Sequence, residues 1–279
     1  MAGMPPATME VNDAVAQRLV RDQRPDLADH PLVRVTNGWD NATFRLGDDL
    51  AVRLPRRAEA VPLILHEQRY VPDIARRSPV AVPVPVHAGR PTSAPQAAGR
   101  PLKVWPISCW PFTCPPKPAS RCTLSGDAAA GSWRFGMERL VDRKRYPQAA
   151  ALREAWAQAC ATEAWDGPAM MLHGDLHPGN IMLADRGSLA GVIDIGDVGA
   201  GDPAVDLAVG WLMFDAGTRH RFMGGFGSAV DGDTCMRARG WALILSTAML
   251  SDSDDNPRMF AVGKFGIRQI LDARPSLQL

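Results

Sequence analysis

Three short apolar segments, separated by polar loops, lie in the second half of this 279-residue chain. Residues 170–172, 181–183 and 191–195 consist mainly of Met, Ile, Leu and Val, and each segment is too short for a stable helix. We therefore predict three strands. The loops between them carry Asp, Asn and His side chains close to the strand ends. A chain of this kind is expected to bring several polar groups to one end of a small sheet.

The N-terminal part of the chain predicts a small antiparallel sheet with two helices. Apolar spacing indicates a helix over residues 10–22 and strands over 33–35, 42–46 and 50–54. Gly47-Asp48-Asp49 is typical of a turn, so the second and third strands are predicted to form a hairpin. Leu63, Glu67, Tyr70 and Ile74 share one helical face. Residues 80–86 alternate Val with Pro, which favours an edge strand or an extended segment.

The C-terminal part is predicted to be mostly helical. Helices are indicated over residues 142–165, 235–250 and 257–272. A further helix is expected over Ala204–Phe214, with Asp202 as its N-cap and Pro203 in its first turn. The order of elements predicts an α+β protein of two lobes, in which a small N-terminal antiparallel-sheet lobe precedes a larger, mostly helical lobe.

Composition restricts the partners and the compartment. The formal net charge of +1 gives no electrostatic reason to expect nucleic acid or an anionic membrane surface as a partner. We see no apolar run long enough to span a bilayer and no secretory pattern at the N-terminus. The five cysteines show no metal-type pairing. We therefore expect a cytoplasmic protein with reduced thiols.

The polar loops carry the residues that indicate chemistry. His173 to Asn180 reads HGDLHPGN, and the third strand continues into Asp194. Phosphoryl transfer needs a carboxylate to orient the acceptor hydroxyl, and oxygen ligands to hold Mg²⁺ against the phosphates. Asp175, Asn180 and Asp194 are candidates for these tasks. Two other interpretations stay open: polar turn residues that only cap strands, or a His173–Asp175–His177 metal site of a hydrolase.

The combined motif HGDLHPGN…VIDIGDVGAGDPAVDLA closely resembles the aminoglycoside-phosphotransferase family. The resemblance implies a protein-kinase-like fold and transfer of the γ-phosphate of ATP or GTP to a hydroxyl group of a small molecule. Asp175 would then be the catalytic base, and Asn180 and Asp194 would hold Mg²⁺. In the family, the Asp that matches Asp206 binds the backbone of the catalytic loop; a simple exposed position is the alternative. His173 and His177 are interpreted as residues that brace the loop.

The resemblance also implies a nucleotide-binding pair in the N-terminal lobe. Arg53 lies on the strand where many relatives have a Lys that contacts the phosphates, and Glu67 follows on the next helix as its orienting partner. Arg keeps the positive charge but has a planar, forked head. A surface Arg on an edge strand is the competing interpretation. The loop of residues 37–41 occupies the place of the phosphate-covering loop, although it holds a single glycine.

One segment departs from the family pattern. We divide the chain into an N-terminal nucleotide-binding lobe (1–90), an atypical hinge or linker (91–135) and a C-terminal catalytic and acceptor-binding lobe (136–279). Residues 101–122 hold six prolines, which would break the hinge strand and the helix expected there. With permitted codons, a shifted reading frame over Pro101–Pro115 encodes an amphipathic helix. The segment is therefore either a frame-shifted stretch or a genuine, unusual loop, and sequencing of the gene distinguishes the two.

The acceptor is left open by the sequence. Cationic antibiotics would meet acidic side chains in the C-terminal helices, where candidates are Asp215, Asp231, Asp233, Asp252, Asp254 and Asp255. Trp211 and Trp241 would line the pocket or belong to the core. The favoured function is an antibiotic phosphotransferase that confers resistance. The alternatives are a catalytically impaired or non-catalytic relative with a disrupted hinge, a choline- or homoserine-type metabolite kinase, and the metallohydrolase.

Overall fold

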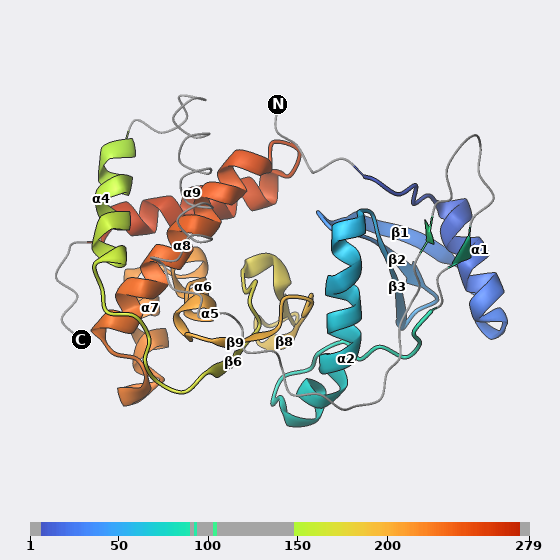
Figure 1. Ribbon diagram of the computed structural model, residues 1–279, viewed down its shortest axis with the longest axis horizontal. Coiled ribbons are helices and arrows are strands. Elements are labelled where there is room, and N and C mark those ends of the chain that lie inside the picture. The colour runs from blue at the N-terminus through green and yellow to red at the C-terminus, as the bar shows by residue number, and fades with distance from the viewer. Residues whose placement is uncertain (1–6, 90–91, 94–102, 105–147, 274–279) are drawn as a thin grey trace. The chain divides into compact units, whose positions relative to one another are not determined.

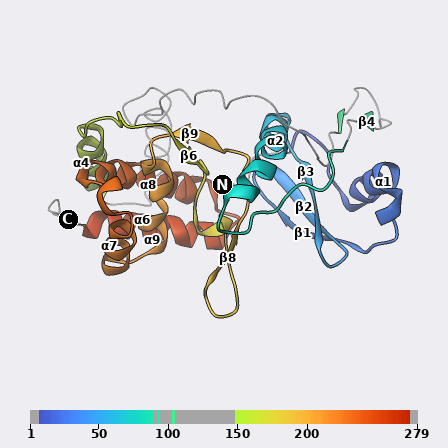
Figure 2. The ribbon, with the colours of Figure 1, turned by 90° about the horizontal axis from the view of Figure 1, so that it is seen from below.

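The computed structural model describes residues 7–89, 92–93, 103–104 and 148–273. These residues fall into two compact units, one before and one after the 105–147 segment, and each unit is described by itself. Figure 1 shows the elements of both, and Figure 2 shows them from below. The expected α+β organisation, with an antiparallel sheet in the first unit and mostly helices in the second, is confirmed.

The first unit is built on a three-stranded antiparallel sheet in the order β1-β2-β3. Its elements are α1 (Asp13–Gln23), η1 (Pro25–Leu27), β1 (Leu32–Asn37), β2 (Asn41–Leu46), β3 (Leu50–Pro55), η2 (Ala58–Ala60), α2 (Val61–Arg77), β4 (Thr92–Ser93) and β5 (Lys103–Val104). The predicted first helix and the three predicted strands are confirmed, with ends that shift by at most three residues. The predicted hairpin is also confirmed, because Leu46 pairs with Leu50 across the turn.

The core of this unit lies between α1 and the sheet. Alternation along β2 buries Ala42, Phe44 and Leu46 on one face, and Leu19 and Val20 of α1 belong to the same cluster. Burial of each large apolar side chain contributes about 1.5–3 kcal/mol relative to exposure. The amphipathic pattern of α1 and the two-residue period of β2 are therefore the sequence signals that fold this unit.

The structure refines two predictions for the first unit. Along α2 the buried residues are Ile64, Glu67, Gln68 and Val71, so of the four residues predicted to share one helical face only Glu67 is fully buried. Residues 80–86 form no ladder strand, and Ala81 makes only an isolated bridge, which leaves the extended segment of the two forms predicted. The alternating prolines explain this, because Pro has no backbone N–H to donate to a neighbouring strand. The short pair β4–β5 lies inside the segment 91–135, most of which is outside the described residues.

The second unit holds two small antiparallel sheets and a helical core. Its elements are α4 (Ala149–Cys160), β6 (Met170–Leu172), η3 (Pro178–Asn180), β7 (Ile181–Leu183), β8 (Leu189–Val192), β9 (Gly199–Gly201), α5 (Ala204–Leu207), α6 (Val209–Met213), α7 (Ala216–Gly224), η4 (Gly227–Ala229), α8 (Gly232–Asp252) and α9 (Pro257–Asp272). β6 pairs with β9, and β7 pairs with β8. The strands predicted at 170–172 and 181–183 are confirmed to the residue.

Several bounds in the second unit differ from the predictions. The third strand, predicted over residues 191–195, ends at Val192, because Asp194 turns into the left-handed region with a φ of 61°. The helix predicted over residues 204–214 is two short helices that meet at Ala208. The predicted helix at 142–165 is confirmed over 149–160, and its first residues lie outside the described part of the chain.

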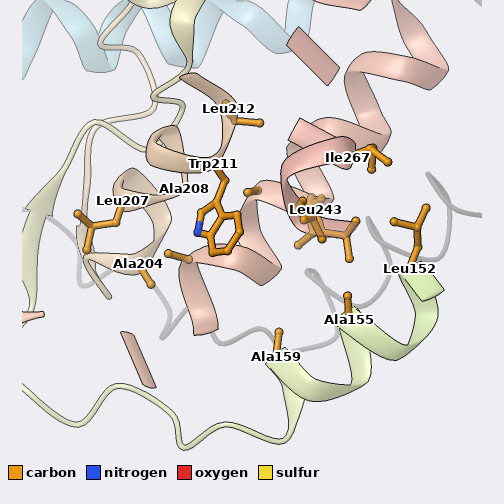
Figure 3. Packing of buried hydrophobic residues seen from close by; sticks show 14 of the residues in the cluster. Leu152, Ala155, Ala159, Ala204, Leu207, Ala208, Trp211, Leu212, Leu243 and Ile267 are labelled. Carbon is orange, nitrogen blue, oxygen red and sulfur yellow. The ribbon is translucent and has the colours of Figure 1, made fainter. Parts of the chain in front are cut away.

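Trp211 lies in the middle of the helical core. Its side chain is almost fully buried and belongs to one apolar cluster with residues of α4, α5, α8 and α9; Figure 3 shows Ala204, Ala208 and Leu243 around it. The Arg219 guanidinium stacks over the Trp211 ring at 3.8 Å from its centroid. A large buried aromatic group of this kind is a main source of core stability. No helix in the described residues is both long enough and apolar enough to cross a membrane.

Candidate active site

The loop that follows β6 is held in place by a single carboxylate. Asp206, on α5, accepts hydrogen bonds from the backbone N–H of His173 at 2.6 Å and of Gly174 at 3.0 Å. Burial raises the pKa of Asp206, while these two N–H donors act in the opposite direction. The α5 carboxylate thus holds two successive N–H groups of the loop, from residues far apart from it in the sequence. This contact fixes the loop backbone at the two residues that precede Asp175.

Gly174 allows this loop to touch the loop that follows β8. Its φ is +88°, a region that side-chain-bearing residues rarely adopt. A Cβ atom at this position would lie 2.2 Å from the backbone oxygen of Asp197. Only glycine therefore allows the two loops to approach so closely.

The imidazole of His173 joins the same two loops. Its Nδ1 accepts a hydrogen bond from the backbone N–H of Asp175 at 3.3 Å, and its Nε2 lies 2.9 Å from the backbone oxygen of Ile193. An acceptor Nδ1 leaves the ring proton of neutral His on Nε2, where it is donated to Ile193. Both ring nitrogens are thus engaged by the backbone.

Asn180 connects the loop to the end of the β7–β8 hairpin. The side chain is buried, and its Nδ2 donates to the backbone oxygen of Asp175 at 2.9 Å. Its own backbone oxygen accepts from Ile193 N at 3.0 Å, next to the Ile181–Val192 pair of the hairpin. Asp194 is the next residue. The structure therefore brings Asp175, Asn180 and Asp194 to one end of this hairpin.

His177 lies close to the Asp175 side chain. Its Nδ1 accepts from the backbone N–H of Gly179 at 3.0 Å, and its Nε2 lies 3.6 Å from Asp175 Oδ2. Burial, and then the nearby His173, lowers the pKa of His177 to about 4, although the Asp194 charge opposes this. The ring is therefore neutral at pH 7. The described residues contain no group of three or more His, Cys, Asp and Glu side chains that could hold a metal ion.

The predicted nucleotide-binding pair is formed within the first unit. Arg53 Nη1, on β3, lies 2.6 and 2.5 Å from the two carboxylate oxygens of Glu67 on α2. The Glu67 side chain is buried and the Arg53 side chain is a quarter exposed. A charge-assisted contact of this kind fixes the direction of a guanidinium.

Four of the residues considered for acceptor binding have structural roles. Asp215 and Asp231 are the N-caps of α7 and α8, where each accepts from a backbone N–H at 2.7 Å. Trp211 is a core residue, and Trp241 packs against the same core while partly buried.

Sequence reasoning missed one buried ion pair. Arg237 Nε, on α8, donates to Asp202 Oδ2 at 2.7 Å, and both side chains are about 6% exposed. The prediction of Asp202 as the N-cap of the following helix is wrong by one residue, because Pro203 is the N-cap and α5 begins at Ala204; Asp202 Oδ1 nevertheless accepts a hydrogen bond from Ala204 N. The missed signal is the occurrence of Arg237 and Arg239 next to the apolar residues 241–245 of a helical stretch, since a buried Arg requires a partner.

Comparison with known proteins agrees with this arrangement. Residues 116–241, somewhat less than half of the chain, match the model of the phosphotransferase enzyme family, APH. The sequence resemblance is thereby confirmed, and with it the predicted enzyme class of phosphotransferase. No curated protein gave a significant match.

Solved structures of phosphotransferases are similar in fold to this chain. The GDP and kanamycin complex of APH(2")-IIIa has a TM-score of 0.57 at 16% identity, over 91% of this chain and 96% of that one. A macrolide 2'-phosphotransferase type I has a TM-score of 0.54 at 18% identity, over 96% of this chain and 100% of that one. A microcompartment-associated aminopropanol kinase has a TM-score of 0.55 at 15% identity, over 93% of this chain and 95% of that one. At these identities the likeness establishes the phosphotransferase fold.

Proposed function

We propose that this protein transfers the γ-phosphate of ATP or GTP to a hydroxyl group of a small molecule, with Asp175 as the catalytic base. The observation that carries the proposal is a pair of hydrogen bonds that join Asn180 to Asp175 and to Ile193, the residue before Asp194. They are the Asn180 side-chain bond to Asp175 O and the Ile193 N–H bond to Asn180 O. Turn residues that only cap strands need no such connection between two loops.

In the proposed reaction, the acceptor oxygen forms a bond to the γ-phosphorus while the bond from that phosphorus to the β–γ bridging oxygen breaks. The nucleoside diphosphate leaves, and the hydroxyl proton passes to Asp175. The Asp175 side chain suits this role because about two fifths of it is exposed, so an acceptor can reach it. A positioned carboxylate is the group that protein kinases use at this step.

Asn180 and Asp194 would hold Mg²⁺. The donor set fits this ion, because an amide oxygen and a carboxylate are hard oxygen ligands. Nδ2 of Asn180 is already bound to Asp175 O, which leaves Oδ1 as the free ligand atom of that amide. When bound, the ion would neutralise charge on the phosphates. The ring nitrogens of His173 are bound to the backbone, which argues against the hydrolase metal site considered from sequence.

Arg53 is proposed to contact the nucleotide phosphates, oriented by Glu67. The contact of Arg53 Nη1 with both carboxylate oxygens of Glu67 supports this role, because it fixes the orientation of the guanidinium. Structural relatives support a nucleotide co-substrate: APH(2")-IIIa, named above, was solved with GDP, and a further relative, APH(2")-IIa, was solved with streptomycin and ATP.

For the acceptor, we propose an antibiotic hydroxyl, of the aminoglycoside or macrolide class, and hence a role in resistance. The names of the structural relatives support both classes, and the aminopropanol kinase supports a metabolite alcohol as the runner-up. A screen of ATP and GTP consumption across aminoglycosides, macrolides, peptide antibiotics and metabolite alcohols distinguishes these acceptors.

Substitution of Asp175 tests the mechanism. We expect Asp175→Asn to lower kcat by roughly 10²–10⁴-fold, the usual contribution of a positioned base, while nucleotide affinity stays within about twofold. The matched control is Asp185→Asn, an exposed carboxylate in the β7–β8 turn, which should leave kcat unchanged. Retention of turnover in Asp175→Asn would disprove the role of this residue.

A catalytically impaired relative is the second candidate, and the proline-rich 101–122 stretch is the observation that favours it. Such a protein would keep every residue named above but would bind nucleotide poorly. If the gene encodes no amphipathic helix in any shifted frame, the frame-shift explanation fails and the active enzyme is favoured.

A further inference from the structure

The orientation of the His177 ring is determined by Gly179. The Gly179 N–H donates to His177 Nδ1 at 3.0 Å, which makes His177 the N-cap of η3. The ring also occupies the space where a side chain on Gly179 would lie, because a Cβ atom there would be 2.8 Å from His177 Cε1 and 3.4 Å from Met259 Sδ. The imidazole is therefore fixed by a hydrogen bond and by packing over a glycine.

This orientation has a chemical consequence at the opposite ring nitrogen. Because Nδ1 is an acceptor, the neutral ring carries its proton on Nε2. Nε2 lies 3.6 Å from Asp175 Oδ2, and the His177 side chain is 14% exposed. The separation is longer than a hydrogen bond, but hydrogen bonds in catalytic sites often tighten only when the substrates are bound. Capping of η3 by Nδ1 would not by itself direct Nε2 toward the carboxylate.

We propose that His177 is a positioning residue for Asp175. Its Nε2–H restrains the Oδ2 atom of the carboxylate, so that Oδ1 is presented to the acceptor hydroxyl. The ring remains neutral and takes no proton from the substrate. This inference rests on the proposed function, and it assigns His177 a task beyond bracing the loop.

Two substitutions separate the two tasks of the ring. In His177→Asn, the amide oxygen takes the place of Nδ1 and keeps the cap to Gly179, but the side chain is too short to reach Asp175. In His177→Gln, the longer side chain can place its amide N–H near Asp175, while the cap is weakened. The Asn variant therefore keeps the structural role, and the Gln variant keeps the positioning role.

We expect His177→Asn to keep the wild-type melting temperature and the KM for nucleotide, and to lose roughly 10- to 100-fold in kcat, since a misplacement of about 1 Å can cost 10²-fold. His177→Gln should have a higher kcat than His177→Asn despite a lower melting temperature. Wild-type kcat in the Asn variant, or a Gln variant slower than the Asn variant, would overturn the proposal.

A second measurement uses the unmodified protein. The ¹⁵N NMR shifts of the His177 ring at pH 7, assigned by their loss in His177→Asn, should be those of the neutral Nε2–H tautomer. An Nδ1–H tautomer would overturn the proposal. This measurement requires neither nucleotide nor acceptor, so failure of the inference is distinguished from failure of the proposed phosphoryl transfer.

Discussion

At the scale of single residues, Gly174 is the position where a small change should have the largest effect. We expect Gly174→Ala to destabilise the fold and to abolish turnover, because the new Cβ would meet the Asp197 backbone oxygen in addition to the strain of a positive φ. The loss should exceed about 1–2 kcal/mol, the cost of the left-handed conformation alone. Urea denaturation and kcat measure the two effects.

Gly187 is the matched control for this prediction. It also has a positive φ, of +78°, but a Cβ atom there would have no neighbour within 4 Å. Gly187→Ala should therefore show only the conformational cost, with kcat unchanged. Equal losses in the two variants would mean that the contact between the loops contributes nothing.

The candidate site was predictable as a set of residue types. Asp175, Asn180 and Asp194 follow from their order at strand ends, and the structure brings them together. The partner of Arg237 and the tautomer of His177 were not predictable, because each depends on contacts between elements far apart in the chain. Residue types indicate the available chemistry, while the tertiary structure decides which atoms face one another.

At the scale of elements, the start of α8 depends on Asp231. This residue accepts from Thr234 N at 2.7 Å, and hydrogen bonds from Thr234 lower its pKa below 3.8. We expect Asp231→Ala to lower the free energy of unfolding by about 1 kcal/mol, the usual contribution of an N-cap. Asp233 is exposed in the first turn of α8, and Asp233→Ala should lower the free energy of unfolding by at most a few tenths of a kcal/mol.

The same cap gives a defined pH dependence. Because the folded-state pKa of Asp231 is depressed, its contribution is present above the unfolded value near 3.8 and is lost as the pH falls through the folded value. The difference in unfolding free energy between wild type and Asp231→Ala should therefore narrow below about pH 4. A difference that is constant between pH 7 and pH 3 would contradict the assignment.

Two buried arginines show how the helices of the second unit hold one another. Arg219 donates to the backbone oxygen of Phe214 at the end of α6, and Arg239 donates to the backbone oxygen of Ile270 in the last turn of α9. Helix C-termini carry partial negative charge, which compensates a buried guanidinium. Burial lowers the pKa of both guanidinium groups from their very high ordinary value. Apolar periodicity alone gives no indication of such contacts, and α7, which carries Arg219, was not predicted.

At the scale of the whole molecule, each unit has its own apolar core. The two-lobed α+β fold was predictable because strand patterns precede helix patterns along the chain. The segment between the units was not, since its prolines remove the local signals on which such predictions depend.

Nucleotide binding should stabilise the intact protein. At a nucleotide concentration of 100 times Kd, Mg²⁺–ATP or Mg²⁺–GTP should add about 2.7 kcal/mol of stability, seen as a rise of several degrees in the melting temperature. Arg53→Met should reduce this rise, and Arg45→Met, on the exposed side of β2, should not. The absence of any rise with either nucleotide would favour the impaired relative over the enzyme.

The bond between Asp206 and the β6 loop has a consequence for biosynthesis. The carboxylate is 33 residues downstream of the first amide that it holds, His173 N. During translation, the HGDLHPGN stretch therefore leaves the ribosome well before the group that gives it its shape. A nascent chain that ends before residue 206 contains all residues of the HGDLHPGN stretch but lacks the carboxylate that fixes the conformation of this loop.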